Sequence, residues 1–187
     1  MSEHTLQGWY TVFTDRAEIS PLVPTRPWNP ALSTWLRTVD DATLAPGAGS
    51  HTAIAIRSAL YLWNDCLDES HRLSQSLKTS IGSYLHGIMH RREPDYRNAK
   101  YWFRNTGNPP IASAISSSIM DAFPDDSALL PPPLSREKSW NPASFVDACE
   151  QAAGQSGAAA YQILQQLQDI EIRCCLDLLM KDTTVPR

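Results

Sequence analysis

Two histidines and one glutamate in the segment SYLHGIMHRREPDY have a spacing that suits metal binding. In an α-helix each residue turns the side-chain direction by about 100°, so His86 and His90 point about 40° apart. By the same geometry Glu93 lies about 20° on the other side of His86. If this segment is helical, all three side chains share a strip about 60° wide and point toward one place.

A third histidine, His71, falls in the preceding segment. Residues 52–77 contain no proline or glycine, and apolar residues recur there at intervals of three and four, so we expect a single helix with His71 on its inner face. The short connection over residues 78–80 favours antiparallel packing of this helix on the next one. The sequence therefore predicts that His71 lies opposite His86 and His90.

Three imidazoles with a fourth position left open are typical of a catalytic zinc ion. Two histidines with Glu93 would instead form the facial set that holds non-haem iron. We favour Zn²⁺ held by His71, His86 and His90, because buried polar groups need partners and one ion supplies a partner to all three. The alternative is that each histidine is a neutral core residue with one hydrogen bond, and that Glu93 is an exposed partner of a nearby arginine.

Other residues near these histidines carry weaker signals. Asp68, about 60° around the helix from His71, is either an acceptor for an imidazole or part of a solvated face. Gly82 and Gly87 are costly in a helix, which predicts a close approach there by the preceding helix or by a ligand. A basic and aromatic stretch either binds phosphate, stacks an aromatic substrate, or packs its rings while exposing its charges; it comprises Arg91, Arg92, Tyr96, Arg97, Lys100, Tyr101, Trp102, Phe103 and Arg104.

The elements that position these residues are all predicted to be helical. Five prolines before residue 50 indicate a wrapping arm, residues 1–50, with a short helix over residues 31–38. Trp9, Trp28 and Trp35 indicate that this arm packs onto the rest of the chain. Further helices are expected over residues 81–93, 95–104, 111–123, 142–153 and 156–181, with an extended connection over residues 124–139. The fold class is thus an all-α single domain, residues 1–187, whose residues 51–181 form an irregular bundle of five or six helices.

Composition narrows the functional class. Of the 187 residues 42% are apolar and 19% charged, and the net charge of -4 provides no positive field to attract nucleic acid. No stretch approaches the roughly 18 to 20 apolar residues of a membrane span, and the first residues lack a secretory pattern. We expect a cytoplasmic protein with neither a membrane nor a nucleic acid as partner. Its four cysteines, Cys66, Cys149, Cys174 and Cys175, are expected to be reduced, buried thiols.

The blocks LWNDCLDESHRLSQSL and GSYLHGIMHRREPDYRNAKYWFRNTGNPP resemble a family of small helical proteins of fungi and some bacteria. Within it the chain is most similar to the cyclopenases of quinolone-alkaloid pathways, which are zinc-containing proteins likened to haemocyanin. The resemblance implies a ring contraction: a cyclopenin-type benzodiazepinedione epoxide becomes a viridicatin-type 4-aryl-3-hydroxyquinolin-2-one with loss of methyl isocyanate. A Lewis acid suits this chemistry, and Glu93 would shuttle the proton as general base and then acid.

Two function classes follow from these observations. The first is a zinc-dependent lyase or isomerase that acts on a small aromatic metabolite. The second is a helical binding module in which the histidines are structural and the basic, aromatic stretch meets a partner. A third reading is an iron or copper protein that uses oxygen. The oligomeric state is left open by the sequence.

Overall fold

The computed structural model describes residues 16–107, 111–124, 130–131, 134, 139–181 and 183, and within them the fold is all-α, without a strand. The helices are α2 (Pro30–Thr38), α3 (Asp41–Leu44), α4 (Ser50–Trp63), α5 (Leu67–Ser76), α6 (Ser80–Arg92), α7 (Tyr96–Arg104), α8 (Ile111–Ala122), α9 (Pro142–Gln151) and α10 (Ala159–Met180). The predicted all-α, single-domain class is confirmed. The described residues hold nine helices, two in the arm and seven, α4 to α10, in the bundle, so the expected number of five or six is too low.

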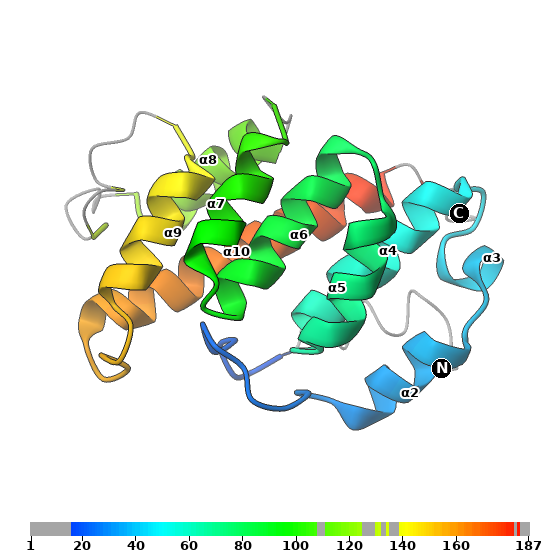
Figure 1. Ribbon diagram of the computed structural model, residues 1–187, viewed down its shortest axis with the longest axis horizontal. Helices are drawn as coiled ribbons and strands as arrows, with labels where there is room; N and C mark the ends of the chain where they lie inside the picture. Colours follow the sequence, from blue (N-terminus) through cyan, green and yellow to red (C-terminus); the bar gives the residue numbers. More distant parts are fainter. Residues whose placement is uncertain are drawn as a thin grey trace.

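The helices form two layers around one hydrophobic core. In Figure 1, α9, α7, α6 and α5 lie side by side in the layer nearest the viewer, and the long α10 runs behind them. Contacts join α6 to α5 and α7, α7 to α9, and α10 to α4, α8 and α9. Helix α6 therefore lies at the centre of the front layer, with one neighbour on each side.

The predicted single helix over residues 52–77 is wrong, because the chain breaks it into α4 and α5. Asp65 adopts a left-handed backbone conformation with φ of 63°, which ends the helical ladder. The neighbouring Asn64 side chain bonds outside the helix: its Nδ2 donates to Asn29 O at 2.9 Å. Two polar residues with partners elsewhere in the molecule thus override a local pattern that is continuous in the sequence.

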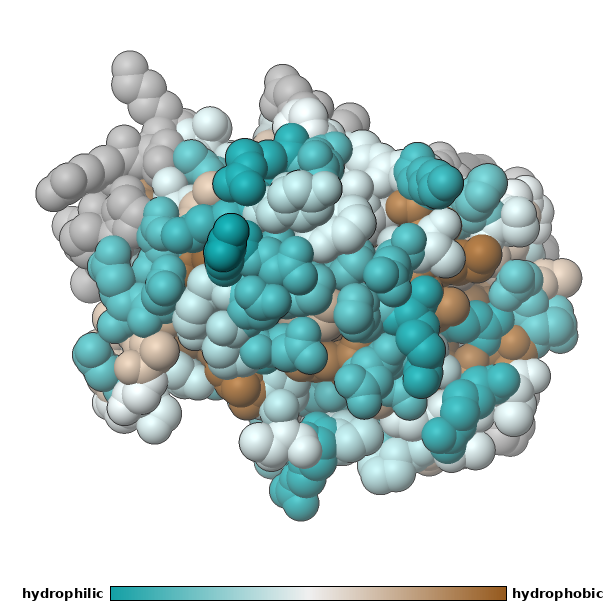
Figure 2. All heavy atoms as spheres, viewed as in Figure 1, coloured by the Kyte–Doolittle hydropathy of each residue, from teal (hydrophilic) through white to brown (hydrophobic). Residues whose placement is uncertain are grey.

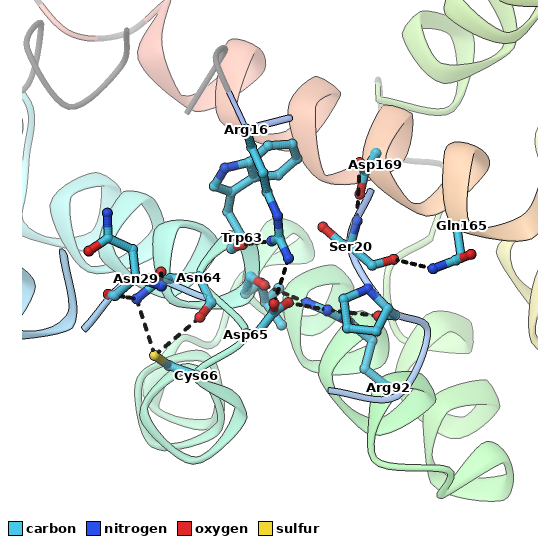
Figure 3. Close-up of polar contacts among 12 residues, drawn as sticks. Arg16, Ser20, Asn29, Trp63, Asn64, Asp65, Cys66, Arg92, Gln165 and Asp169 are labelled. Atoms are coloured by element: carbon cyan, nitrogen blue, oxygen red, sulfur yellow. Dashed lines mark hydrogen bonds and ion pairs between the residues drawn. The ribbon is translucent and has the colours of Figure 1, made fainter. Parts of the chain in front are cut away.

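A buried ionic cluster occupies this break (Figure 3). Arg16 Nη2 lies 2.7 Å from Asp65 Oδ2, and Arg92 Nη2 pairs with Asp65 Oδ1. The same two guanidinium groups also donate to main-chain carbonyls, Arg16 to Trp63 O at 2.7 Å and Arg92 to Pro21 O at 3.0 Å. One carboxylate thereby ties the N-terminal arm, the α4–α5 break and the end of α6 together.

The arm wraps the bundle as predicted over its described residues. In Figure 1 it runs in blue along the lower edge of the helices before α2. The Asn29 side chain caps α2 by accepting from the backbone N–H groups of Ala31 and Leu32, and Trp35 is buried. Trp28 N donates to Asn64 O at 3.0 Å. The expectation for Trp9 lies outside the described residues. Within the arm, α3 is a further short helix that the prolines and glycines did not suggest.

The remaining helices lie close to their predicted positions. Thr79, Asp95 and Asn141 cap α6, α7 and α9 with their side-chain oxygens, and Pro142 occupies the first turn of α9 as expected. Most of the predicted extended connection, residues 124–139, lies outside the described residues. Of the helices described, none is both long and apolar enough to cross a bilayer. The face seen in Figure 2 is mostly hydrophilic, with hydrophobic side chains showing in narrow strips.

Asp65→Asn tests whether the ionic cluster holds the arm and α6 in place. Asparagine tolerates the left-handed backbone, but it leaves two buried guanidinium groups without an anion. We expect the free energy of unfolding to fall by about 3–5 kcal/mol in urea denaturation. The matched control is Asp68→Asn, because Asp68 is exposed in the first turn of α5, where the loss should stay below about 1 kcal/mol. Equal losses for the two variants would contradict this account.

Candidate metal centre

The three predicted histidines meet between α5 and α6. His71 comes from α5, and His86 and His90 come from successive turns of α6. One potential ligand atom from each ring lies within 4.8 Å of the others, and the ring centroids are 4.7 to 5.1 Å apart. The two helices pack against each other, as the short connection between them predicted.

The glycines of α6 allow this close packing. A Cβ added to Gly82 would lie 2.4 Å from Leu77 Cβ, so the first turn of α6 sits directly on the end of α5. A Cβ added to Gly87 would lie 2.8 Å from the Phe103 ring of α7. The predicted approach by the preceding helix is observed at Gly82, whereas Gly87 is approached by the following helix, α7, which was not predicted.

His86 is the most unusual group of the site. The residue is 1% exposed, and neither ring nitrogen has a hydrogen-bond partner among the residues that the structure describes. Burial, reinforced by the nearby His90 and His71, lowers the pKa of His86 to about 3. The ring is therefore neutral at pH 7, with an available lone pair. The alternative of a core histidine satisfied by one hydrogen bond does not describe this residue.

The residues fit a zinc ion. A tetrahedral zinc with Zn–N distances of about 2.0–2.1 Å holds its ligand nitrogens roughly 3.3 Å apart. The candidate ligand atoms lie up to 4.8 Å apart, so the side chains would rotate to bring their nitrogens to that spacing. A bound cation would give the buried His86 the partner that the protein does not provide. One flank of the site is aromatic, because the Trp102 ring stacks on His86 with centroids 4.0 Å apart and 19° between the planes.

Both ring nitrogens of His90 have polar protein neighbours, from the end of α6 and the start of α7. Glu93 Oε2 lies 3.4 Å from His90 Nδ1, and Asp95 Oδ2 lies 3.9 Å from the same atom. Asn98 Nδ2 lies 3.0 Å from His90 Nε2. Burial is the largest influence on His90 and lowers its pKa, while the two carboxylates oppose that shift. A carboxylate on one imidazole nitrogen is the usual arrangement around a metal-bound histidine, and a metal at the other nitrogen, Nε2, would have to displace Asn98.

Glu93 lies beside the histidine cluster and not within it. Its side chain is 50% exposed, and the group of converging ligand atoms comprises the three histidines alone. This arrangement favours the three-histidine set over the set of two histidines and one carboxylate. Asn98 was not predicted. The sequence feature that could have indicated Asn98 is its position eight residues after His90. The turn at Pro94 lies between them, and it brings the start of α7 back over the end of α6.

Several weaker candidates lie outside the site. Asp68 is exposed, which matches its interpretation as part of a solvated face. The basic stretch is not one patch: Arg91 and Arg92 are buried in ion pairs, and Lys100 pairs with acidic groups of α9. Of the interpretations of this stretch, phosphate binding and the binding module therefore lack the charges of Arg91 and Arg92. The four cysteines are free and buried, as predicted.

No protein-family model, curated protein or solved structure matches this chain. The candidate centre therefore rests on its own geometry.

Replacing His86 with phenylalanine separates a metal ligand from a structural histidine. The phenyl ring keeps the stacking on Trp102 and removes two unpartnered nitrogens, so we expect the metal-free protein to keep its free energy of unfolding or gain up to about 2 kcal/mol. Urea denaturation in the presence of a chelator measures this. The matched control is Tyr84→Phe on the same helix. Its hydroxyl bonds Glu171 and Trp140, so its removal should cost about 1–3 kcal/mol. A loss above about 1 kcal/mol for His86→Phe would contradict the assignment.

Proposed function

We propose that the protein is a zinc enzyme whose ion is held by His71, His86 and His90. The observation that carries the proposal is the buried, neutral and unpartnered His86 ring within a cluster of three imidazoles. Leaving two ring nitrogens desolvated without partners is costly unless a ligand satisfies one of them. Three protein ligands leave the fourth tetrahedral position for a substrate.

The surrounding residues support Lewis-acid chemistry on a small aromatic molecule. Zinc bound there supplies a Lewis acid that polarises a carbonyl or epoxide oxygen. The Trp102 ring, stacked on His86, gives one side of the centre an apolar, aromatic character. Glu93 is near the cluster yet half-exposed, so it exchanges protons with solvent and acts as general base and then as general acid. Asp95, 3.9 Å from His90 Nδ1, helps to orient the ring, and Asn98 releases Nε2 when the ion binds.

The reaction that we propose is the ring contraction implied by the sequence resemblance. A cyclopenin-type epoxide is converted to a viridicatin-type quinolinone plus methyl isocyanate, and the atoms of the substrate equal those of the two products. No outside oxidant or reductant is required, which is consistent with a site that holds only imidazoles, a carboxylate and an aromatic ring. A reducing, cytoplasmic location accompanies this proposal because all four cysteines are free thiols.

Zinc binding is tested by elemental analysis of the purified protein. We expect about one equivalent of zinc per chain, and at least a tenfold loss of zinc affinity for His71→Ala, His86→Ala and His90→Ala. The matched control is His51→Ala, since His51 is exposed at the start of α4 and lies outside the cluster. A chain that stays metal-free after reconstitution with zinc would overturn the proposal.

The reaction is tested by incubating the zinc-loaded protein with cyclopenin and following viridicatin by absorbance and mass spectrometry. Glu93→Gln should retain its zinc and lower kcat about 10²- to 10⁴-fold, because the amide cannot accept the proton. Glu18→Gln, at an exposed position of the arm, is the control and should leave kcat unchanged. If the zinc-loaded wild type does not convert cyclopenin, the proposed reaction is wrong although the metal site stands.

A further inference from the structure

A second site lies away from the histidine cluster. A cavity of about 300 Å³ is enclosed by the arm at Leu22, the end of α6 at Arg91, the start of α7 at Tyr96 and the first half of α10 at Tyr161. None of the three clustered histidines lines it. Its volume is at the lower end of the range for small-molecule pockets, and its walls are mainly apolar.

Arg91 brings unused hydrogen-bond donors to this cavity. Its Nη2 pairs with Glu171 Oε2, and its guanidinium lies 4.1 Å from the centre of the Phe145 ring. Within the described part of the chain its Nε and Nη1 have no partner, although the residue is only 2% exposed. Glu171 is fully occupied, since Tyr84 donates to its other oxygen at 2.9 Å. Arg91 and Glu171 therefore form a neutral pair that still has N–H groups to donate.

Gln168 brings an unused acceptor to the same cavity. Its Nε2 donates to Pro21 O at 3.0 Å, which fixes the orientation of the amide because the reverse would place two oxygens together. Its Oε1 is then left without a partner, and the side chain is fully buried. The cavity thus has an unsatisfied donor group and an unsatisfied acceptor, each of which is costly to desolvate alone.

These two residues define the ligand by its chemistry. A carboxylate would satisfy Arg91, but it would introduce a second negative charge near Glu171 and would offer Gln168 no proton. A ketone can accept from Arg91 but has no proton to donate to Gln168, and an alcohol has a single oxygen for both contacts. A group with both a carbonyl oxygen and an N–H serves both residues. Tyr96 and Tyr161 provide aromatic surface for a flat, apolar body. Cys149 adds no charge, because burial raises the pKa of its thiol to about 12.

We propose that this cavity binds a small, neutral aromatic amide, whose carbonyl oxygen accepts from Arg91 and whose N–H donates to Gln168. The ligand takes no part in the chemistry proposed at the histidines. The proposal for this cavity can therefore be tested independently of the zinc site. Its occupation fixes the arm, α6 and α10 against one another, because the cavity is bounded by all three.

The test is a titration of the full chain with benzamide, followed by ligand-observed NMR and calorimetry. We expect saturable binding at one site with a Kd of about 1 mM or lower. Benzoate, of the same shape but charged, should bind at least about tenfold more weakly, and acetophenone, which lacks the N–H, about three- to tenfold more weakly. The variant His86→Phe should bind benzamide as the wild type does. Equal or tighter binding of benzoate or acetophenone, or no saturable binding of benzamide up to about tenfold above that Kd, would overturn the proposal.

Two variants place the binding in the cavity. Ala153→Trp fills the cavity from an exposed position and should abolish benzamide binding, whereas Ala122→Trp, exposed on α8 and away from the cavity, should not change it. Gln168→Leu should lower benzamide affinity to that of acetophenone and leave acetophenone unchanged. A melting curve of each variant verifies that it folds. If Gln168→Leu does not fold, Ala153→Trp still tests whether benzamide binds in the cavity. Unchanged binding to Ala153→Trp would contradict the assignment.

Discussion

Two consecutive arginines at the end of α6 hold the rest of the structure together. Their side chains point about 100° apart, so each meets a different buried carboxylate. Arg92 pairs with Asp65 at the break between α4 and α5, and Arg91 pairs with Glu171 on α10. Both pairs are almost wholly excluded from solvent. The end of the central helix is thereby fixed to both layers and to the arm.

This fixation determines where the histidines lie. The Asp65 carboxylate sits just before α5, so its pair with Arg92 sets where α5 starts relative to α6. The contact of Gly82 with Leu77 sets the other end of the same helix pair. With both ends fixed, His71 faces His86 and His90. The cluster is formed by the fold itself, which is the arrangement expected of a site that binds its ligand without large rearrangement.

Much of this arrangement can be predicted from the sequence. The parts that cannot be predicted have one physical cause in common. Helical periodicity, side-chain caps and the two glycines are local signals, so α6, α7 and α9 and the shared strip of His86 and His90 are predictable. The break at Asp65 depends on Arg16 and Arg92, which are far from it in the chain, and no local pattern shows it. For the same reason Arg91 and Arg92 looked like exposed charges: the carboxylates that bury them come from other elements. Asn98 required knowledge of how the turn at Pro94 folds α7 back over α6.

Some buried polar groups of helix α6 have all their hydrogen-bond partners, and others do not. We interpret the first kind as contributing to stability and the second as contributing to function. Tyr84, in the first half of the helix, has its hydroxyl fully satisfied by Glu171 and Trp140. His86, two residues later, and Arg91, near the end, retain atoms without partners. A helix that can satisfy one buried hydroxyl so completely has no geometric reason to leave its neighbours unsatisfied. Orphaned buried polar atoms oppose folding, and those of His86 and Arg91 lie at a histidine cluster and at a cavity, where a ligand would complete them, whereas Arg92 Nε lies in an ion-pair cluster.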